Sequence, residues 1–258
     1  MRTLTTIMAV MLLAANLSAK LHTEVVEYEH DGVTLEGYLA YDDATTDQRP
    51  GVMVVHEWTG LNDYARARTE QLAELGYIAF AADIYGKGVR PQTAEEAGAQ
   101  ATIYRSDRAL MRARAAAGLE VLRQHELSDP NRLAAIGYCF GGGVVLELAR
   151  SGVQISGVVS FHGNLDTPDP ADAKQIKGSV MVAHGAADPH VGRDQVDAFV
   201  KEMNGAGVDW YMVEYGSAVH SFTNPESGDD PSRGVAYNEN ADRRSWLEMR
   251  NFFQDIFR

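Results

Sequence analysis

The chain has one cysteine, Cys139, among its 258 residues, so it cannot form an internal disulfide bond. It is also poor in positive charge, with 23 Lys and Arg against 36 Asp and Glu and a formal net charge of -13. A surface this acidic repels nucleic acid and anionic lipid, so we expect neither as a partner and no stable membrane association. Metal-binding and phosphate-binding motifs are missing too: no second histidine follows "HE" at helical spacing, and no Lys-Ser/Thr follows the "CFGGG" glycines.

The N-terminus has the features of an export signal. Arg2 precedes a short apolar run at 7–15, and small residues lead to Ala19. The run is too short to span a bilayer, which takes about 20 residues. We therefore expect a signal peptide over 1–19 and a periplasmic or secreted protein, although Leu17 departs from the usual Ala-x-Ala cleavage pattern. A retained anchor or a first strand are the alternatives.

The remainder, 20–258, shows no repeat, low-complexity tract or linker, which predicts one domain. Short runs rich in Val, Ile and aromatic residues alternate with helical patterns, as in an α/β fold with a mostly parallel sheet and helices on both faces. The expected strands are 23–29, 34–41, 51–57, 77–84, 132–138, 155–162, 179–185 and 209–215, and the expected helices are 62–75, 94–123, 141–150, 192–204 and 242–257. The first two strands alternate in polarity around "HDG", which predicts an antiparallel hairpin.

Cys139 lies where the strand "RLAAIGY" meets the helix "FGGGVVLELA". Gly137 and Gly141 flank it in the nucleophile-elbow pattern, with cysteine in place of serine. Glycines are needed there because a nucleophile on so tight a turn leaves no room for neighbouring side chains. The helix N-terminus favours the thiolate. A buried inert cysteine is the alternative, and it leaves the glycines unexplained.

Two further side chains complete a candidate triad. Asp188 follows the strand "SVMVAHG", and His220 follows "WYMVEY", the next strand along the chain. Strands of a parallel sheet end at one edge, so Cys139, Asp188 and His220 can meet there. The order nucleophile, acid, histidine is that of the α/β-hydrolase fold.

The chain resembles the dienelactone hydrolase family, on the motifs "HDGVTLEGYLAY", "VVHEWTGLN", "ADIYGKG", "GYCFGGG", "HGAAD" and "HSFTNP". The resemblance implies that Cys139 is the nucleophile, His220 the base and Asp188 its partner. It also implies that Glu57 contacts the resting thiol and helps to deprotonate it when substrate binds; a surface carboxylate is the alternative for Glu57. The backbone N–H groups of Phe140 and Trp58 are the expected oxyanion hole.

The substrate-binding residues depart from the family pattern. Enzymes of this family that act on the dienelactone carboxylate use two basic residues, and here Lys87 and the neutral Asn224 stand at those places. Lys87 lacks the bidentate fork of arginine. Arg90 and Arg233, in irregular loops, are possible substitutes or solvated surface charges. We therefore expect weak recognition of a small anionic lactone.

These observations favour an exported cysteine-nucleophile hydrolase of small carboxylic esters or lactones that works through an acyl-enzyme and needs no cofactor or metal. One alternative is a thiol redox sensor or ligand-binding protein on the same fold. Another is an acyltransferase or peptidase with the same triad, because the fold alone does not determine the chemistry.

Overall fold

The computed structural model describes residues 20–258, and the expected signal segment 1–19 lies outside the described residues. One eight-stranded sheet has the order β1-β2-β4-β3-β5-β6-β7-β8. The strands are β1 (Leu21–His30), β2 (Val33–Asp42), β3 (Arg49–Val55), β4 (Ile78–Ala82), β5 (Ser128–Tyr138), β6 (Gly157–Phe161), β7 (Ser179–Gly185) and β8 (Trp210–Tyr215). β1 and β2 are antiparallel to their neighbours and all other pairings are parallel, so the predicted mostly parallel α/β sheet is confirmed.

The predicted N-terminal hairpin is also confirmed. Asp31 and Gly32 join β1 to β2 with φ angles of 50° and 73°. Positive φ at both central residues is the geometry of a type I′ turn, which matches the twist of the strands it joins. The turn sets a register in which His30 faces Val33.

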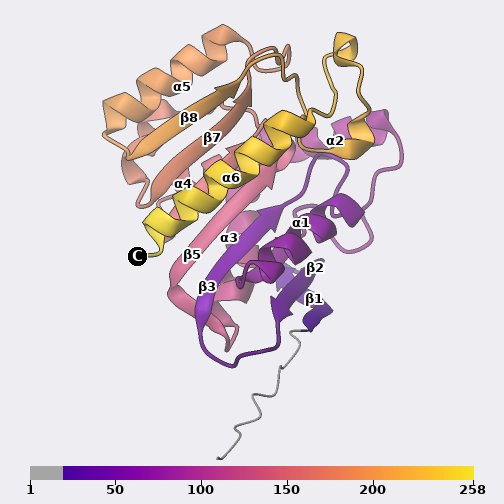
Figure 1. Cartoon of the computed structure of the whole chain (residues 1–258), viewed down its shortest axis with the longest axis vertical. Helices are drawn as coiled ribbons and strands as arrows, with labels where there is room; N and C mark the ends of the chain where they lie inside the picture. Colours follow the sequence, from indigo (N-terminus) through magenta and orange to yellow (C-terminus); the bar gives the residue numbers. More distant parts are fainter. Residues whose placement is uncertain (1–19) are drawn as a thin grey trace, which may run out of the picture.

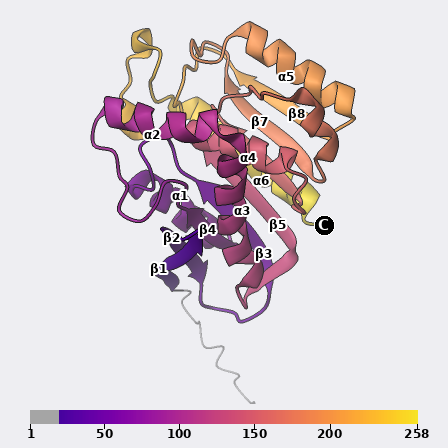
Figure 2. The ribbon, with the colours of Figure 1, turned by 180° about the vertical axis from the view of Figure 1, so that it is seen from behind.

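Helices cover both faces of the sheet. They are α1 (Asp63–Glu74), α2 (Ala94–Ser106), α3 (Arg108–Gln124), α4 (Phe140–Arg150), α5 (Arg193–Ala206) and α6 (Glu239–Ile256). Helices α1 and α6 lie on the face seen in Figure 1, and α3, α4 and α5 lie on the other, seen in Figure 2. The domain is therefore a three-layer α/β/α structure.

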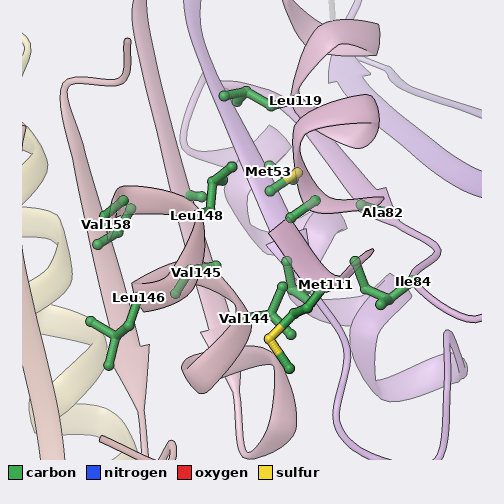
Figure 3. Close-up of a cluster of buried hydrophobic side chains, with 14 of the residues drawn as sticks. Met53, Ala82, Ile84, Met111, Leu119, Val144, Val145, Leu146, Leu148 and Val158 are labelled. Carbon is green, nitrogen blue, oxygen red and sulfur yellow. The ribbon is translucent and has the colours of Figure 1, made fainter. Parts of the chain in front are cut away.

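Strands β3, β4, β6 and β7 are nearly continuous apolar runs because each of them supplies two cores. Along β3, Met53 and Val55 enter the core under α3 and α4, and Val52 and Val54 enter the core under α1 and α6. Successive side chains of a strand point to opposite faces, so both faces need apolar residues. Figure 3 shows the first of these cores, to which α3 and α4 contribute Met111, Leu119, Val144, Val145, Leu146 and Leu148.

The single helix expected over 94–123 is wrong: the structure has two helices, separated at Asp107. The Asp107 side chain accepts a hydrogen bond from the N–H of Leu110 and so begins α3 with an N-cap. Aspartate competes with the helix for backbone hydrogen bonds, and the apolar periodicity on either side concealed the break. The break leaves α2 as a separate helix beside the site described below.

Candidate active site

Cys139 lies in a strained turn between β5 and α4. Its φ is 53° and its ψ is -115°, a conformation that non-glycine residues rarely adopt and that is typical of a nucleophile elbow. A Cβ on Gly137 would collide with the backbone of Gly141, and a Cβ on Gly141 would lie 2.6 Å from the carbonyl oxygen of His56. Both glycines are therefore required by the close approach of backbone to backbone.

The structure brings together the three residues of the candidate triad. The Cys139 Sγ lies 3.1 Å from His220 Nε2, and His220 Nδ1 lies 2.8 Å from Asp188 Oδ2. All three side chains are buried, and the thiol lies at the base of a pocket. A base hydrogen bonded to both a nucleophile and a carboxylate can take the thiol proton and remain oriented while it does so.

The electrostatics of the triad favour a charged pair. Burial lowers the pKa of His220, but the neighbouring Cys139 and the hydrogen-bonded Asp188 raise it more, to about 10. Burial alone would raise the pKa of Asp188, but the hydrogen bond from His220, the charge of that ring and the N–H of His190 together outweigh it, and the pKa falls below its usual value. Asp188 is therefore ionised at neutral pH, and it stabilises the imidazolium that forms when the thiol loses its proton.

The irregular loop before α6 holds His220 in place. The His220 N–H donates to the carbonyl of Gly234 over 3.2 Å, and the Ala236 N–H donates to the carbonyl of His220 over 3.1 Å. Asp188 is fixed separately, because its Oδ1 accepts the N–H of His190 over 2.8 Å. Both ends of the His220–Asp188 hydrogen bond are thus anchored to backbone.

A second histidine, His162, supports the elbow, and the sequence reasoning assigned it no role. Its Nδ1 accepts the Cys139 N–H over 3.1 Å, so the ring proton is on Nε2, which donates to Thr223 Oγ1 over 2.7 Å. Burial and the charge of His220 hold the pKa of His162 well below its usual value. His162 therefore supports the turn as a neutral ring, although it lies only 5.4 Å from the His220 ring.

Glu57 is in the pocket, but its carboxylate does not hydrogen bond to the thiol. Ser221 Oγ donates to one oxygen over 2.9 Å, and Asn224 Nδ2 donates to the other over 2.7 Å. Burial raises the pKa of Glu57, and these two donors oppose that shift. The resting contact with Cys139 implied by the family resemblance is thus replaced by contacts with Ser221 and Asn224, so Asn224 holds Glu57.

The expected oxyanion donors lie at the ends of two neighbouring strands. Phe140 is the first residue of α4, directly after Cys139. Trp58 follows β3, lines the pocket, and has its carbonyl hydrogen bonded to the Tyr85 hydroxyl. The placement of both residues beside the thiol is compatible with an oxyanion hole, which stays a prediction.

The pocket has a volume of about 620 Å³, the size of a small-molecule site. Its wall includes Cys139, His220, Glu57, Trp58, Thr59, Asn62, Arg105, Asn164, His190, Ser221, Asn224, Glu226, Ser227 and Val235. Lys87, expected to bind substrate, is not among them: it is exposed and pairs with Glu27 on β1 over 2.6 Å. Arg90 instead faces Asp83 and Glu36.

Pocket residues that the sequence did not indicate come from four segments of the chain. Arg105 lies on α2, Asn164 and His190 lie in loops after β6 and β7, and Ser221 directly follows His220. For this set the only signal in the sequence was the serine directly after His220, whereas Asn224 had already been named as a substrate-binding candidate. Across residues 20–258, no cluster of three or more His, Cys, Asp or Glu side chains has a metal-binding arrangement.

Comparison with known proteins bears on the chemistry of this pocket. The model of the dienelactone hydrolase family matches residues 35–257. The chain belongs to the dienelactone hydrolase family. The resemblance read from the motifs is thereby confirmed, and so is a hydrolase of the carboxylic ester or lactone type that acts on a small molecule.

Individual relatives agree with this assignment over most of the chain. The solved structure of m3DLH is 41% identical with a TM-score of 0.88, covering 92% of this chain and 98% of that one. A dienelactone hydrolase-like promiscuous phosphotriesterase from metagenomic libraries is 39% identical with a TM-score of 0.87 and the same coverage. A protein of Saccharolobus solfataricus named "putative carboxymethylenebutenolidase" is 25% identical, covering 89% of this chain and 97% of its own. No helix within 20–258 has the length and apolarity to cross a membrane.

Proposed function

We propose that this dienelactone hydrolase family member cleaves carboxylic esters or lactones through a Cys139-His220-Asp188 triad and a thioester acyl-enzyme. The observation that carries the proposal is the hydrogen-bonded chain from Cys139 Sγ to His220 over 3.1 Å and from His220 to Asp188 over 2.8 Å. Catalysis by a nucleophile, a base and an orienting carboxylate requires this connectivity.

The geometry supports a two-step reaction. His220 Nε2 takes the thiol proton, and the Cys139 sulfur adds to the substrate carbonyl while the Phe140 and Trp58 amides bind the oxyanion. The C–O bond then breaks, His220 gives its proton to the departing alkoxide, and a thioester remains. Water deprotonated by His220 attacks the thioester, releases the acid and restores the thiol.

Glu57 fits an auxiliary role in the first step. Its buried carboxylate lines the same pocket as the thiol, and burial raises its pKa, which makes it a better proton acceptor than an exposed carboxylate. Ser221 and Asn224 hold it in the resting enzyme. A substrate that displaces either donor would free the carboxylate to approach Cys139.

The redox-sensor alternative is less well supported than hydrolysis. A sensor needs an exposed thiolate, whereas Cys139 is 7% exposed at the base of its pocket. A sensor also has no use for the His220–Asp188 hydrogen bond. The acyltransferase alternative differs only in whether water or another nucleophile takes the acyl group, and the pocket holds no feature that selects one.

The acyl-enzyme gives the direct test. Mature protein is mixed with excess 4-nitrophenyl acetate, quenched in acid within a second and examined by intact mass and peptide mapping. We expect a burst of 4-nitrophenol and one acetyl group on the peptide that contains Cys139, followed by steady turnover. Steady turnover with the acetyl group on any other residue would reject the assignment of the nucleophile. Assays of enol lactones and thioesters then define the substrate class.

We also propose that the protein is exported, on the basis of Arg2, the apolar run at 7–15 and the small residues ending at Ala19. The full-length gene is expressed in a Gram-negative host, and the cells are fractionated. We expect a shortened protein outside the inner membrane, with an N-terminus near Lys20. A cytoplasmic protein that retains Met1 would rule out the proposal.

A further inference from the structure

Arg105 brings a permanent positive charge to the wall of the catalytic pocket. Among the lining residues within 20–258 it is the one Lys or Arg side chain. Its Nη2 donates to Asn164 Oδ1 over 2.9 Å, and its Cζ lies 5.9 Å from the centre of the Phe140 ring. The guanidinium is exposed to solvent, and the hydrogen bond to Asn164 orients it on the side of the pocket next to the Phe140 ring.

The charge of Arg105 is not neutralised by a carboxylate. The two arginines that follow it along the chain do have acidic partners: Arg108 pairs with Asp166 over 2.7 Å, and Arg112 pairs with Glu147 over 2.7 Å. No ion pair within the described part of the chain includes Arg105, although acidic residues outnumber basic ones 36 to 23. Asn164 uses one of its five N–H donors, so a fork remains for an anion.

Helix α2 runs along the pocket, with Gly98 near Trp58 and Arg105 near Asn164. Gly98 and Arg105 are seven residues apart, so they share a face of α2 and are about 10 Å apart along it. A Cβ at Gly98 would lie 4.0 Å from the Trp58 ring, which lines the same pocket. The Gly98–Arg105 face of α2 therefore runs along the site from Trp58 to Asn164.

We propose that Arg105, oriented by Asn164, is a specificity-determining residue that binds an anionic group on the acyl part of the substrate. The acyl part is favoured because Arg105 lies over the ring of Phe140, the residue whose backbone N–H is the expected oxyanion donor, whereas the leaving oxygen must face His220. The substrates are then half-esters or lactones that carry a carboxylate or a comparable anion. This inference rests on the proposed hydrolase function and deepens it.

The proposal changes the expectation drawn from Lys87 and Asn224. Lys87 pairs with Glu27 at the surface and Asn224 holds Glu57, so neither is placed to bind a carboxylate. A cation nevertheless reaches the pocket from α2. Recognition of an anionic substrate is thus expected, through a residue other than those that the family resemblance indicated.

The test compares two substrates that differ only in charge. Mono-4-nitrophenyl glutarate carries a free carboxylate, and its methyl ester is the neutral equivalent. For the wild-type enzyme we expect a roughly tenfold higher kcat/KM for the anion, since a charge-assisted contact at a partly solvated site is of that order. Arg105→Gln should bring the ratio of the two kcat/KM values close to one, because it lowers kcat/KM for the anion much more than for the neutral ester, and Arg105→Lys should retain part of the preference.

Arg108→Gln is the matched control, because it removes the same charge three residues further along the chain, from the first residue of α3, which lies outside the pocket. It should leave the ratio unchanged. If the wild type hydrolyses both esters with equal kcat/KM, or if Arg105→Gln does not change the ratio of the two kcat/KM values, the role of Arg105 is wrong. The proposed hydrolase function would still stand. The half-esters of succinate and adipate have one methylene fewer and one more than the glutarate ester. Comparing their kcat/KM values shows which distance between the carboxylate and the reacting carbonyl suits Arg105.

A binding measurement separates failure of this inference from failure of the proposed function. If the wild type hydrolyses neither ester, the proposed function fails, and glutarate itself is titrated into the wild type and Arg105→Gln by calorimetry. Binding of glutarate to the wild type but not to Arg105→Gln would still show that Arg105 forms an anion site. Equal heats for the two proteins, or no binding to either, would overturn it.

Discussion

Cys139→Ala should abolish ester hydrolysis, with kcat/KM falling at least about 10⁴-fold, because a triad enzyme without its nucleophile keeps only substrate binding and oxyanion stabilisation. Cys139→Ser should retain a trace of activity. Thiols ionise far more readily than hydroxyls, so a serine at this position depends much more on the histidine base during attack. The serine variant therefore keeps an attacking atom, and the alanine variant has none.

Release of 4-nitrophenol under saturating and limiting substrate measures both effects. Thermal unfolding is the control, because Cys139 is small and neither change fills or empties much of the core. Each variant should unfold within a few degrees of the wild type. An alanine variant that hydrolyses the ester at the wild-type rate would disprove the assignment of the nucleophile.

Gly141→Ala should destabilise the protein by about 3 kcal/mol and remove most of its activity. The added Cβ would lie 2.6 Å from the His56 carbonyl oxygen, and backbone cannot move aside as a flexible side chain can. The elbow would have to shift away from the end of β3, which carries the Cys139 sulfur away from His220. For a domain of this size the loss corresponds to a melting temperature about 6–12 °C lower.

Gly143→Ala, two residues along the same helix, is the matched control. There the Cβ would meet its nearest atom, the Asn164 carbonyl oxygen, at 3.5 Å, an ordinary contact. Alanine favours a helix over glycine by about 1 kcal/mol, so this variant should be as stable as the wild type or slightly more so, and fully active. Equal losses from both substitutions would show that helix α4 tolerates no alanine and that the close approach at Gly141 is not the cause.

Local sequence determined most of the fold. Strands β3, β4, β6 and β7 are short apolar runs because both faces are covered, and Asp31-Gly32 selects the hairpin turn by its tolerance of positive φ. The break at Asp107 was missed because a cap is a single hydrogen bond, whereas apolar periodicity continues across it. Element boundaries depend on such single contacts more than on composition.

The candidate triad could be predicted from the sequence, because Cys139 lies between two glycines and an aspartate and a histidine follow later strands. These signals are local or follow from the rule that parallel strands end at one edge. Tertiary packing sets which polar groups share the pocket. Lys87 pairs with Glu27, 60 residues away in sequence, and Arg105 meets Asn164, 59 residues away. The first pairing depends on how the loop after β4 lies against β1, and the second depends on how α2 packs beside the loop after β6. No local pattern of residues encodes either arrangement.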